Sequence, residues 1–363
     1  MSQQWEQIAV HARRAVMSPV WAAQVLTGAK SFGDNPILGS RRLNELGLHA
    51  GRVALAHRLA TWRRSRLTHL VSAADRAQFD ENGFVLRRDF LPRADFEALV
   101  AQTKAYRGRV REMLQGDTVT RRIAFDKSVL AHIPAARAVL DNPEWRGLIR
   151  YVGSADAEPM IYLQTILPHV VDVGELDPQH DLHGDTFHPS VKAWLFLTDV
   201  AEDDGPFVYV PGSHRLTPQR LAWERRMSIE SAVRDRLTRR GSPRINTAAL
   251  DELGLPPPRT FAVPANSLVV ADTFGFHARG TSVRTSVRVE LWAYGRRSPF
   301  LPWVGFDPWR LTALGLRRAQ WHWRIADLIE EAGSTVNVWV PRTDVGAFDP
   351  GTVAPYYPLR RRW

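Results

Sequence analysis

The sequence predicts a β-rich α+β protein built around an antiparallel barrel or jelly roll. Between residues 84 and 294 it contains several short runs typical of strands, mostly divided by Gly, Pro or Asp turns. Helices do not alternate with these runs, which favours antiparallel pairing. A content of 44% apolar and 10% aromatic residues suffices for a packed core. The expected strands are Phe84–Leu86, Met160–Leu167, Val191–Leu197, Phe207–Val210, Thr260–Val263, Ser267–Ala271 and Ser286–Tyr294.

Composition excludes several classes of protein. The 363 residues include no cysteine, so disulfides, thiolate metal sites and cysteine nucleophiles are ruled out, and His and carboxylate are the strong metal ligands that remain. No segment approaches the roughly 18 uninterrupted apolar residues of a spanning helix. The first residues also lack the charged-then-apolar order of a signal peptide, so a cytoplasmic protein is expected.

Residues 1–70 are expected to form a basic helical extension. They hold ten Arg or Lys against three Asp or Glu, out of a net charge of +10 for the whole chain. Leu48, Leu55, Leu59 and Trp62 fall on one helical stripe, with arginines beside or opposite it. Such a helix either lies on an anionic membrane surface or packs on its own domain. Nucleic-acid binding is weakly supported, because the segment has no aromatic interleaving and no recognised motif.

The remaining chain divides into two parts. Residues 75–298 carry the strand signals, with a charged helical insert at about 217–258 that Thr217 and Pro218 open. Within this part, residues 105–155 are expected to be mixed and helical. Residues 299–363 are rich in tryptophan and are expected to cover the barrel.

The most informative stretch is HDLHGDTFHPSVKAWLFLTD, from His180 to Asp199. His183 and Asp185 are separated by one residue, so an extended backbone places both side chains on the same face. Taken alone, a His-x-Asp tripeptide also arises by chance on a surface loop. A second histidine, His277, follows the predicted strand Ser267–Ala271. Together the three residues have the composition of the 2-His-1-carboxylate site of non-heme iron oxygenases.

The last predicted strand adds a polar face. Arg284, Ser286, Arg288 and Glu290 alternate with apolar residues and therefore point the same way. This face is expected to line a polar cavity. An arginine buried there would need an anion, and its guanidinium matches a carboxylate in bidentate fashion.

From about Arg76 to Tyr294 the sequence resembles the phytanoyl-CoA dioxygenase family of Fe(II)- and 2-oxoglutarate-dependent oxygenases. Five segments carry the resemblance in the family's order: FDENGFVLRRDFLP, LHGDTFHPSVKAWLFLTDV, DDGPFVYVPGSHR, ANSLVVADTFGFHARG, and an arginine eleven residues past the distal histidine. The resemblance implies a cupin-like double-stranded β-helix. It also implies that His183, Asp185 and His277 bind Fe(II), that Arg288 holds the far carboxylate of 2-oxoglutarate, and that O2 is the oxidant.

Several neighbouring residues are candidates for supporting roles. Lys192 and Ser286 are candidates for cosubstrate binding, and the alternative for Lys192 is a solvent-facing position at the strand edge. His188 is a candidate for hydrogen-bonding support of the ligands. Arg279 departs from the small or polar residues that the family often has after the distal histidine. Arg279 or Arg284 would therefore bind substrate or compete with Arg288 for 2-oxoglutarate.

The function that these features favour is hydroxylation of an organic substrate with release of succinate and CO2. An aspartate at position 185 favours hydroxylation, because halogenating relatives lack that carboxylate. The basic extension and the Trp-rich C-terminal part favour a lipid-linked or otherwise amphipathic anionic substrate. Two alternatives remain: a non-oxygenase cupin-type metal protein, and an inactive membrane-surface binding module. Loss of residues 1–70 would abolish the function of a binding module, whereas an oxygenase is expected to keep uncoupled 2-oxoglutarate turnover.

Overall fold

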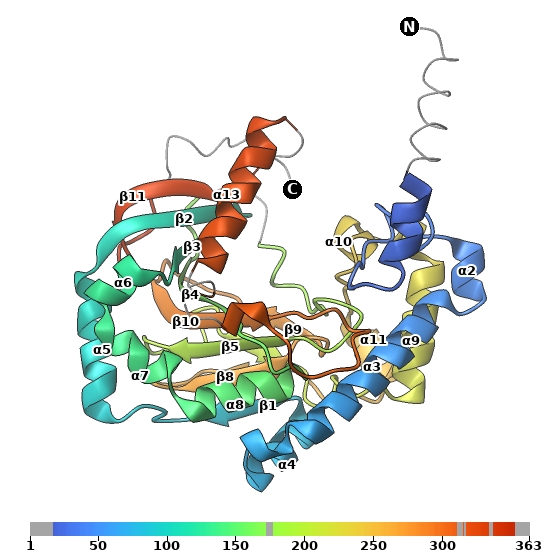
Figure 1. Ribbon diagram of the computed structural model, residues 1–363, viewed down its shortest axis with the longest axis horizontal. Helices are drawn as coiled ribbons and strands as arrows, with labels where there is room; N and C mark the ends of the chain where they lie inside the picture. Colours follow the sequence, from blue (N-terminus) through green and yellow to red (C-terminus); the bar gives the residue numbers. More distant parts are fainter. Residues whose placement is uncertain (1–16, 172–176, 311–314, 316, 334–336, 353–363) are drawn as a thin grey trace, which may run out of the picture.

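Two antiparallel sheets face each other in the computed structural model, which describes residues 17–171, 177–310, 315, 317–333 and 337–352 (Figure 1). The larger sheet has eight strands in the order β1-β8-β5-β10-β4-β3-β2-β11, and the smaller has three in the order β7-β6-β9. The strands are β1 Phe84–Arg87, β2 Arg107–Gln115, β3 Thr118–Ala124, β4 Met160–Leu167, β5 Val191–Phe196, β6 Phe207–Tyr209, β7 Arg259–Phe261, β8 Leu268–Asp272, β9 His277–Arg279, β10 Arg288–Gly295 and β11 Val340–Gly346.

Aromatic side chains fill the space between the two sheets. Trp194 of β5 meets Phe207 of β6 with ring centroids 4.3 Å apart, and Phe84 of β1 meets Phe261 of β7 at 4.8 Å. Edge-to-face and tilted ring contacts of this kind between inner faces are how a β-sandwich builds its core. The β-rich jelly-roll architecture expected from the sequence is therefore confirmed.

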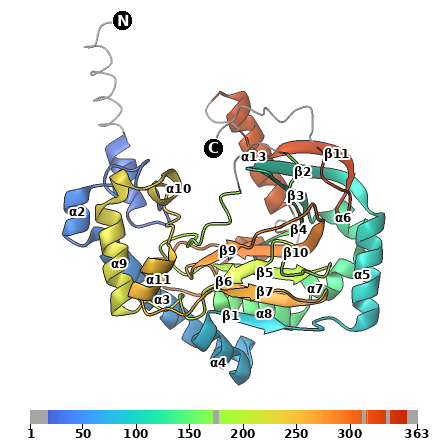
Figure 2. The ribbon, with the colours of Figure 1, turned by 180° about the vertical axis from the view of Figure 1, so that it is seen from behind.

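Helices cover the outer face of the larger sheet. The side chains that β4, β5, β8 and β10 turn outward form one core with helices α4, α5 and α8. A second group of helices stands at the side of the smaller sheet (Figure 2). The helices are α2 Arg41–Glu45, α3 Leu48–Arg66, η1 Thr68–Leu70, α4 Ala73–Asn82, α5 Arg93–Ala105, α6 Lys127–His132, η2 Pro134–Ala136, α7 Arg137–Leu140, α8 Pro143–Val152, α9 Pro218–Ile229, η3 Ser231–Val233, α10 Arg236–Arg239, α11 Thr247–Glu252, η4 Pro308–Arg310 and α13 Arg318–Glu331.

The segment around residues 105–155 differs from the mixed helical expectation. Residues 107–124 form the β2–β3 hairpin, which continues the larger sheet beyond β4. Charged side chains masked the strand pattern, because Arg121 and Glu112 are both buried and pair at 2.7 Å. The described C-terminal part also does more than cover the barrel, since β11 pairs with β2 as the edge strand.

Helix α3 buries a different face from the one that its leucine stripe predicts. Leu55 and Trp62 are 42% and 44% exposed, whereas Arg52 and Arg63 are buried. Each buried arginine donates to three backbone carbonyls: Arg52 to Val25, Thr27 and Ala29, and Arg63 to Ser154, Pro299 and Leu301. These hydrogen bonds compensate the loss of hydration and fix the helix to the body. No helix in the described part of the chain is long and apolar enough to cross a membrane.

Candidate metal centre

Two segments bring the three predicted ligands together: the loop before β5, which carries His183 and Asp185, and the start of β9, which carries His277. His183 and His277 form an isolated antiparallel bridge, in which each backbone N–H donates to the other residue's carbonyl at 2.9 Å. Asp185 is held by its own N–H, which donates to the Thr273 carbonyl at 2.9 Å. A Cβ at Gly184 would lie 3.2 Å from the carbonyl oxygen of Phe274, so a glycine between the ligands lets the two loops approach. The ligand geometry therefore follows from backbone pairing.

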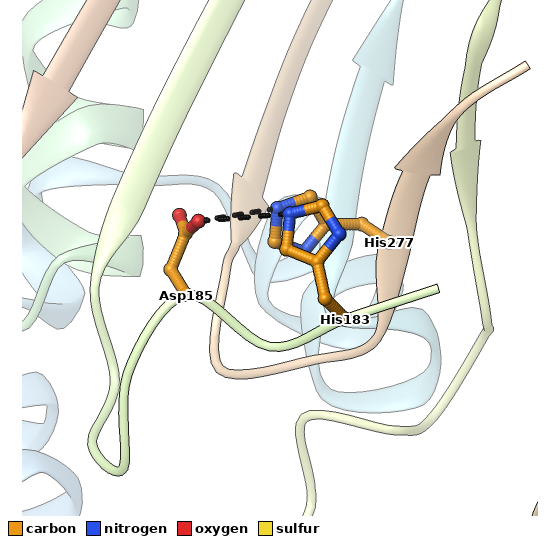
Figure 3. Close-up of side chains that lie close together, drawn as sticks. All are labelled: His183, Asp185 and His277. Atoms are coloured by element: carbon orange, nitrogen blue, oxygen red, sulfur yellow. Dashed lines mark ion pairs between the residues drawn. The ribbon is translucent and has the colours of Figure 1, made fainter. Parts of the chain in front are cut away.

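The ligand atoms converge as a metal site requires (Figure 3). One potential ligand atom from each of His183, Asp185 and His277 lies within 4.8 Å of the others. Asp185 Oδ1 is 4.0 Å from His183 Nε2 and 3.6 Å from His277 Nε2. Within the described ranges this is the one cluster of three such side chains with metal-site spacing.

Backbone carbonyls orient both imidazoles. Nδ1 of His183 lies 2.7 Å from the Asp181 carbonyl, and Nδ1 of His277 lies 2.9 Å from that of Gly275. A carbonyl only accepts, so each Nδ1 carries the proton and each Nε2 is turned toward the site. Nε2 of His277 is buried and has no hydrogen-bond partner among the described residues. An orphaned nitrogen aimed at a carboxylate and a second imidazole fits a metal ion, and the set matches the facial triad that holds non-heme iron.

The charges of the ligands also suit a metal. Burial raises the pKa of Asp185, but Lys192 and the two histidines outweigh it and hold that pKa well below its usual range. Burial holds the pKa of His183 well below its usual value, so this imidazole is neutral near pH 7. Lys192 Nζ lies 2.7 Å from Asp185 Oδ2, which leaves Oδ1 to face the histidines. A carboxylate anchored by one oxygen is well placed to bind a metal through the other.

The triad opens into a cavity of about 390 Å³ with strongly cationic walls. Asp185 is the one acidic side chain in the lining, against five basic ones. Aromatic rings complete the walls. The basic residues are Arg122, Lys192, Arg279, Arg288 and Arg296, and the aromatic ones are Trp194, Phe207, Trp292, Tyr294 and Trp339.

Arg288 begins β10 and is buried in the cavity wall. Its guanidinium donates to the Gly205 carbonyl, and its Nε lies 3.2 Å from Glu290 Oε2 without hydrogen-bond geometry. Burial lowers the pKa of Arg288 and Glu290 opposes that shift. The guanidinium of Arg288 is therefore only partly hydrogen-bonded within the protein and is suited to donate to the carboxylate of a small molecule.

A polar row across three strands supports this arginine. Gln164 of β4 donates to Glu290 Oε1 at 2.7 Å and accepts from Arg122 Nε at 2.8 Å. Arg122 lies over the rings of Trp292 and Trp339, at 4.1 and 4.5 Å from their centroids. Sequence reasoning missed Arg122 because its strand, β3, was expected to be part of a helical region.

The other predicted residues divide between the cavity and its surroundings. Arg279 lines the cavity and pairs with the buried Asp177. His188 is buried outside the lining, where burial lowers its pKa to about 3, and Nε2 has no partner among the described residues. Ser286 lies before β10 and outside the lining, and Arg284 is exposed and paired with Asp203 and Asp204. His180 contacts the Arg279 carbonyl through Nδ1 and is outside the ligand cluster.

The N-terminal extension reaches the metal centre, which the sequence did not indicate. Lys30 Nζ donates to the backbone carbonyl of Asp185 at 2.5 Å, and burial lowers the pKa of this lysine to about 8. Arg64 of α3 pairs with Asp272 at 2.7 Å, at the end of β8. Asp272 Oδ1 in turn accepts the backbone N–H groups of Ser190 and Phe274, on the two ligand-bearing loops. Residues of the extension thus hold the scaffold of the site.

The family model described as Phytanoyl-CoA dioxygenase (PhyH) matches residues 79–239. The match confirms the predicted resemblance and the enzyme class, an Fe(II)- and 2-oxoglutarate-dependent dioxygenase. It includes His183, Asp185 and Lys192, whereas His277 and Arg288 lie beyond it and join the site through the fold. No curated protein sequence matches the chain.

Solved structures give more distant similarities. The epimerase SnoN, in complex with Fe3+, alpha ketoglutarate and nogalamycin RO, is 18% identical with a TM-score of 0.41, over 67% of this chain and 93% of its own. HygX from Streptomyces hygroscopicus, with nickel, 2-oxoglutarate and hygromycin B bound, is 15% identical with a TM-score of 0.37, over 62% and 87%. AviO1 from Streptomyces viridochromogenes Tue57 is 16% identical with a TM-score of 0.38, over 62% and 96%. These similarities carry no argument about the substrate.

Proposed function

We propose that this dioxygenase hydroxylates an amphipathic, anionic organic molecule, with His183, Asp185 and His277 as the iron ligands. The observation that carries the proposal is the convergence of three oriented ligand atoms on a cavity with five basic side chains and one acidic one. Bound iron would supply activation of dioxygen, coupled to decarboxylation of 2-oxoglutarate to succinate and CO2. The protein would contribute the binding and orientation of the reactants and the exclusion of water.

Each wall residue has a role that follows from its position. Arg288 offers its guanidinium to the far carboxylate of 2-oxoglutarate, as the buried cation on the strand facing the triad. Lys192 holds Asp185 Oδ2 and so keeps Oδ1 directed at the metal. The basic side chains exceed what a single dianionic cosubstrate neutralises. Arg279 is already paired with Asp177, but Arg122 and Arg296 also line the cavity and form no ion pair with a described residue. This excess supports a substrate that carries negative charge.

Titration with Fe(II) and 2-oxoglutarate without oxygen tests the proposal. The wild-type protein is expected to show a metal-to-ligand charge-transfer band, followed by succinate when oxygen is admitted. Asp185→Ala is expected to lose both signals, whereas Asp251→Ala, on the exposed face of α11, is expected to keep them. The proposal is contradicted if the wild-type protein shows neither the charge-transfer band nor succinate and Asp185→Ala behaves in the same way.

Peripheral contact with an anionic membrane is proposed as the setting for a lipid-linked substrate. It is supported by the outward face of α3, which exposes Leu55 and Trp62 beside Arg58 and Arg66. Apolar and basic side chains on one face suit the headgroup region of a bilayer. Flotation with anionic vesicles tests it: binding is expected at low salt and is expected to weaken in Trp62→Ser. A protein that stays in the soluble fraction at both low and high salt refutes membrane contact.

A further inference from the structure

A second cavity, of about 270 Å³, adjoins the catalytic one at the ends of β5 and β10. Val191, Gly295 and Arg296 line both cavities, and Val191 pairs with Gly295 in the sheet. Lys192 lines the catalytic cavity, whereas Val191 packs with Ile149 of α8 on the other side of the sheet. Successive strand residues point to opposite faces, so the two cavities lie on opposite faces and meet around the strand ends.

At the border between the cavities no side chain of residue 295 separates them, and the neighbouring side chain is positively charged. Gly295 has no side chain, and a Cβ there would already lie 3.0 Å from Val191 Cγ1. Arg296 is exposed and forms no ion pair with a described residue. Two other cations, Lys30 and Lys192, lie near enough to Arg296 to interact with it electrostatically. An anion is the group that this border would stabilise.

The outer cavity has aromatic walls on a well-anchored loop. Trp303 is 49% exposed and Phe306 is 94% exposed with a φ of 64°, while Trp309 completes the wall. The loop backbone is held by Arg297, which donates to the carbonyls of Val304 and Gly305 at 2.5 and 3.0 Å. Exposed aromatic side chains on a fixed backbone beside a cavity are typical of a binding surface.

The acidic residues of the outer cavity are already engaged within the protein. Glu158 pairs with Arg150 at 2.6 Å. Asp307 accepts the backbone N–H groups of Glu158 and Trp309 at 2.6 and 3.1 Å. These carboxylates are committed to internal contacts. Two further cations of the lining, Arg297 and Arg318, donate to backbone carbonyls of the protein, which leaves Arg296 as the charged group that faces a ligand at the border.

We propose that one substrate spans both cavities, which deepens the proposed function and rests on it. Its reacting part lies beside His183, Asp185 and His277, its anionic group contacts Arg296, and an apolar or aromatic arm lies along Trp303 and Phe306. The catalytic cavity must also hold 2-oxoglutarate, so a larger substrate has to leave it across the Gly295 border. The substrate class is an extended amphipathic anion with its charge between the oxidised part and the arm.

A pair of fluorescent probes tests the outer site. The anionic probe is 1-anilinonaphthalene-8-sulfonate, and the neutral probe is N-phenyl-1-naphthylamine, which lacks the sulfonate. Arg296→Gln is expected to weaken binding of the anionic probe about tenfold and to leave the neutral probe unchanged, as expected for loss of a charge-assisted contact. Trp303→Ala and Phe306→Ala are expected to weaken both probes. The matched controls are Arg137→Gln on α7 and Val233→Ala in η3, exposed residues that line neither cavity.

The inference and the proposed function fail separately. If Arg296→Gln and Trp303→Ala bind both probes as the wild type does while the Fe(II)/2-oxoglutarate band is intact, the outer site is refuted and the enzyme mechanism stands. If the band is absent, the proposed function fails whatever the probes show. Occupation of the outer cavity is also expected to shift the band of the wild type and leave that of Trp303→Ala unmoved. A probe that binds without any shift in the wild type refutes a substrate spanning both cavities.

Discussion

Replacing Arg64 by methionine is expected to destabilise the protein through Asp272. The two side chains pair at 2.7 Å, with 14% exposure for Arg64 and none for Asp272. Methionine keeps most of the apolar stem over the Phe79 ring but removes the charge. Breaking a buried ion pair by removing one partner costs about 3–5 kcal/mol, because the other charge stays buried. At about 2.1 cal/mol/K per residue for 363 residues, this loss lowers Tm by about 4–7 °C.

The loss is expected to depend on pH. Burial already raises the pKa of Asp272, and removing Arg64 raises it further, since Arg64 is the group that chiefly lowers it. A carboxyl whose pKa is higher in the folded state stabilises that state below the unfolded pKa, and this contribution is lost as pH rises through the folded pKa. The Tm difference between Arg64→Met and wild type is therefore expected to be small in acid and to grow toward neutral pH.

Differential scanning calorimetry from pH 4 to 8, with a double-mutant cycle, measures this effect. Asp272→Asn keeps an oxygen for the N–H groups of Ser190 and Phe274 and removes the charge, so it is expected to restore part of the Tm of Arg64→Met. Arg66→Met, an exposed site on the same helix, is the control. A Tm change in Arg64→Met no larger than in Arg66→Met, or one that Asp272→Asn does not reduce, refutes the reasoning.

Three further predictions concern the site. Arg288→Leu is expected to raise the KM for 2-oxoglutarate at least tenfold in succinate assays, because a buried charge-assisted contact is lost, while Arg284→Leu, outside the cavity, leaves it unchanged. Lys192→Met is expected to weaken metal binding about 10–100-fold in titrations with Mn(II), and an unchanged affinity would show that Lys192 does not orient Asp185. Removing residues 1–70 is expected to abolish soluble, metal-binding protein, because Lys30 and Arg64 leave with them; retained 2-oxoglutarate turnover would contradict this.

The triad was predictable because few residue types can do its chemistry. Without cysteine, histidine and carboxylate were the ligands to find, and His183 and Asp185 lie one residue apart. The strands β4, β5, β8 and β10 were predictable as apolar runs, since they are buried on both faces of the larger sheet. The geometry that joins His277 to His183 is a single backbone bridge between distant segments, which local pattern does not specify.

Strands β2 and β3 were missed because their stability comes from partners far away in the chain. Arg111 pairs with Asp327 at 2.5 Å, and Arg121 donates to the carbonyl of Gly346 at 2.8 Å. Both partners lie more than 200 residues further along. Charged residues in a segment suggest a solvated helix when they are read locally. The tertiary pairing of β2 and β3 outweighs that local preference. Arg122, which lies on β3, was missed as a cavity residue for the same reason.

The N-terminal extension shows how a charge excess can mislead. Its arginines and leucines suggested a helix with a basic face that either lies on an anionic membrane surface or packs on its own domain through the leucine stripe. In the structure Arg52 and Arg63 are the buried side chains of α3, and Leu55 and Trp62 face outward. An arginine can be buried when carbonyl acceptors fill its fork, and a helix that crosses several loop ends meets many such acceptors. Arg52 and Arg63 thus fix α3 to the body, while Lys30 and Arg64 contact Asp185 and Asp272 beside the candidate metal centre, so loss of the extension is expected to impair the site itself.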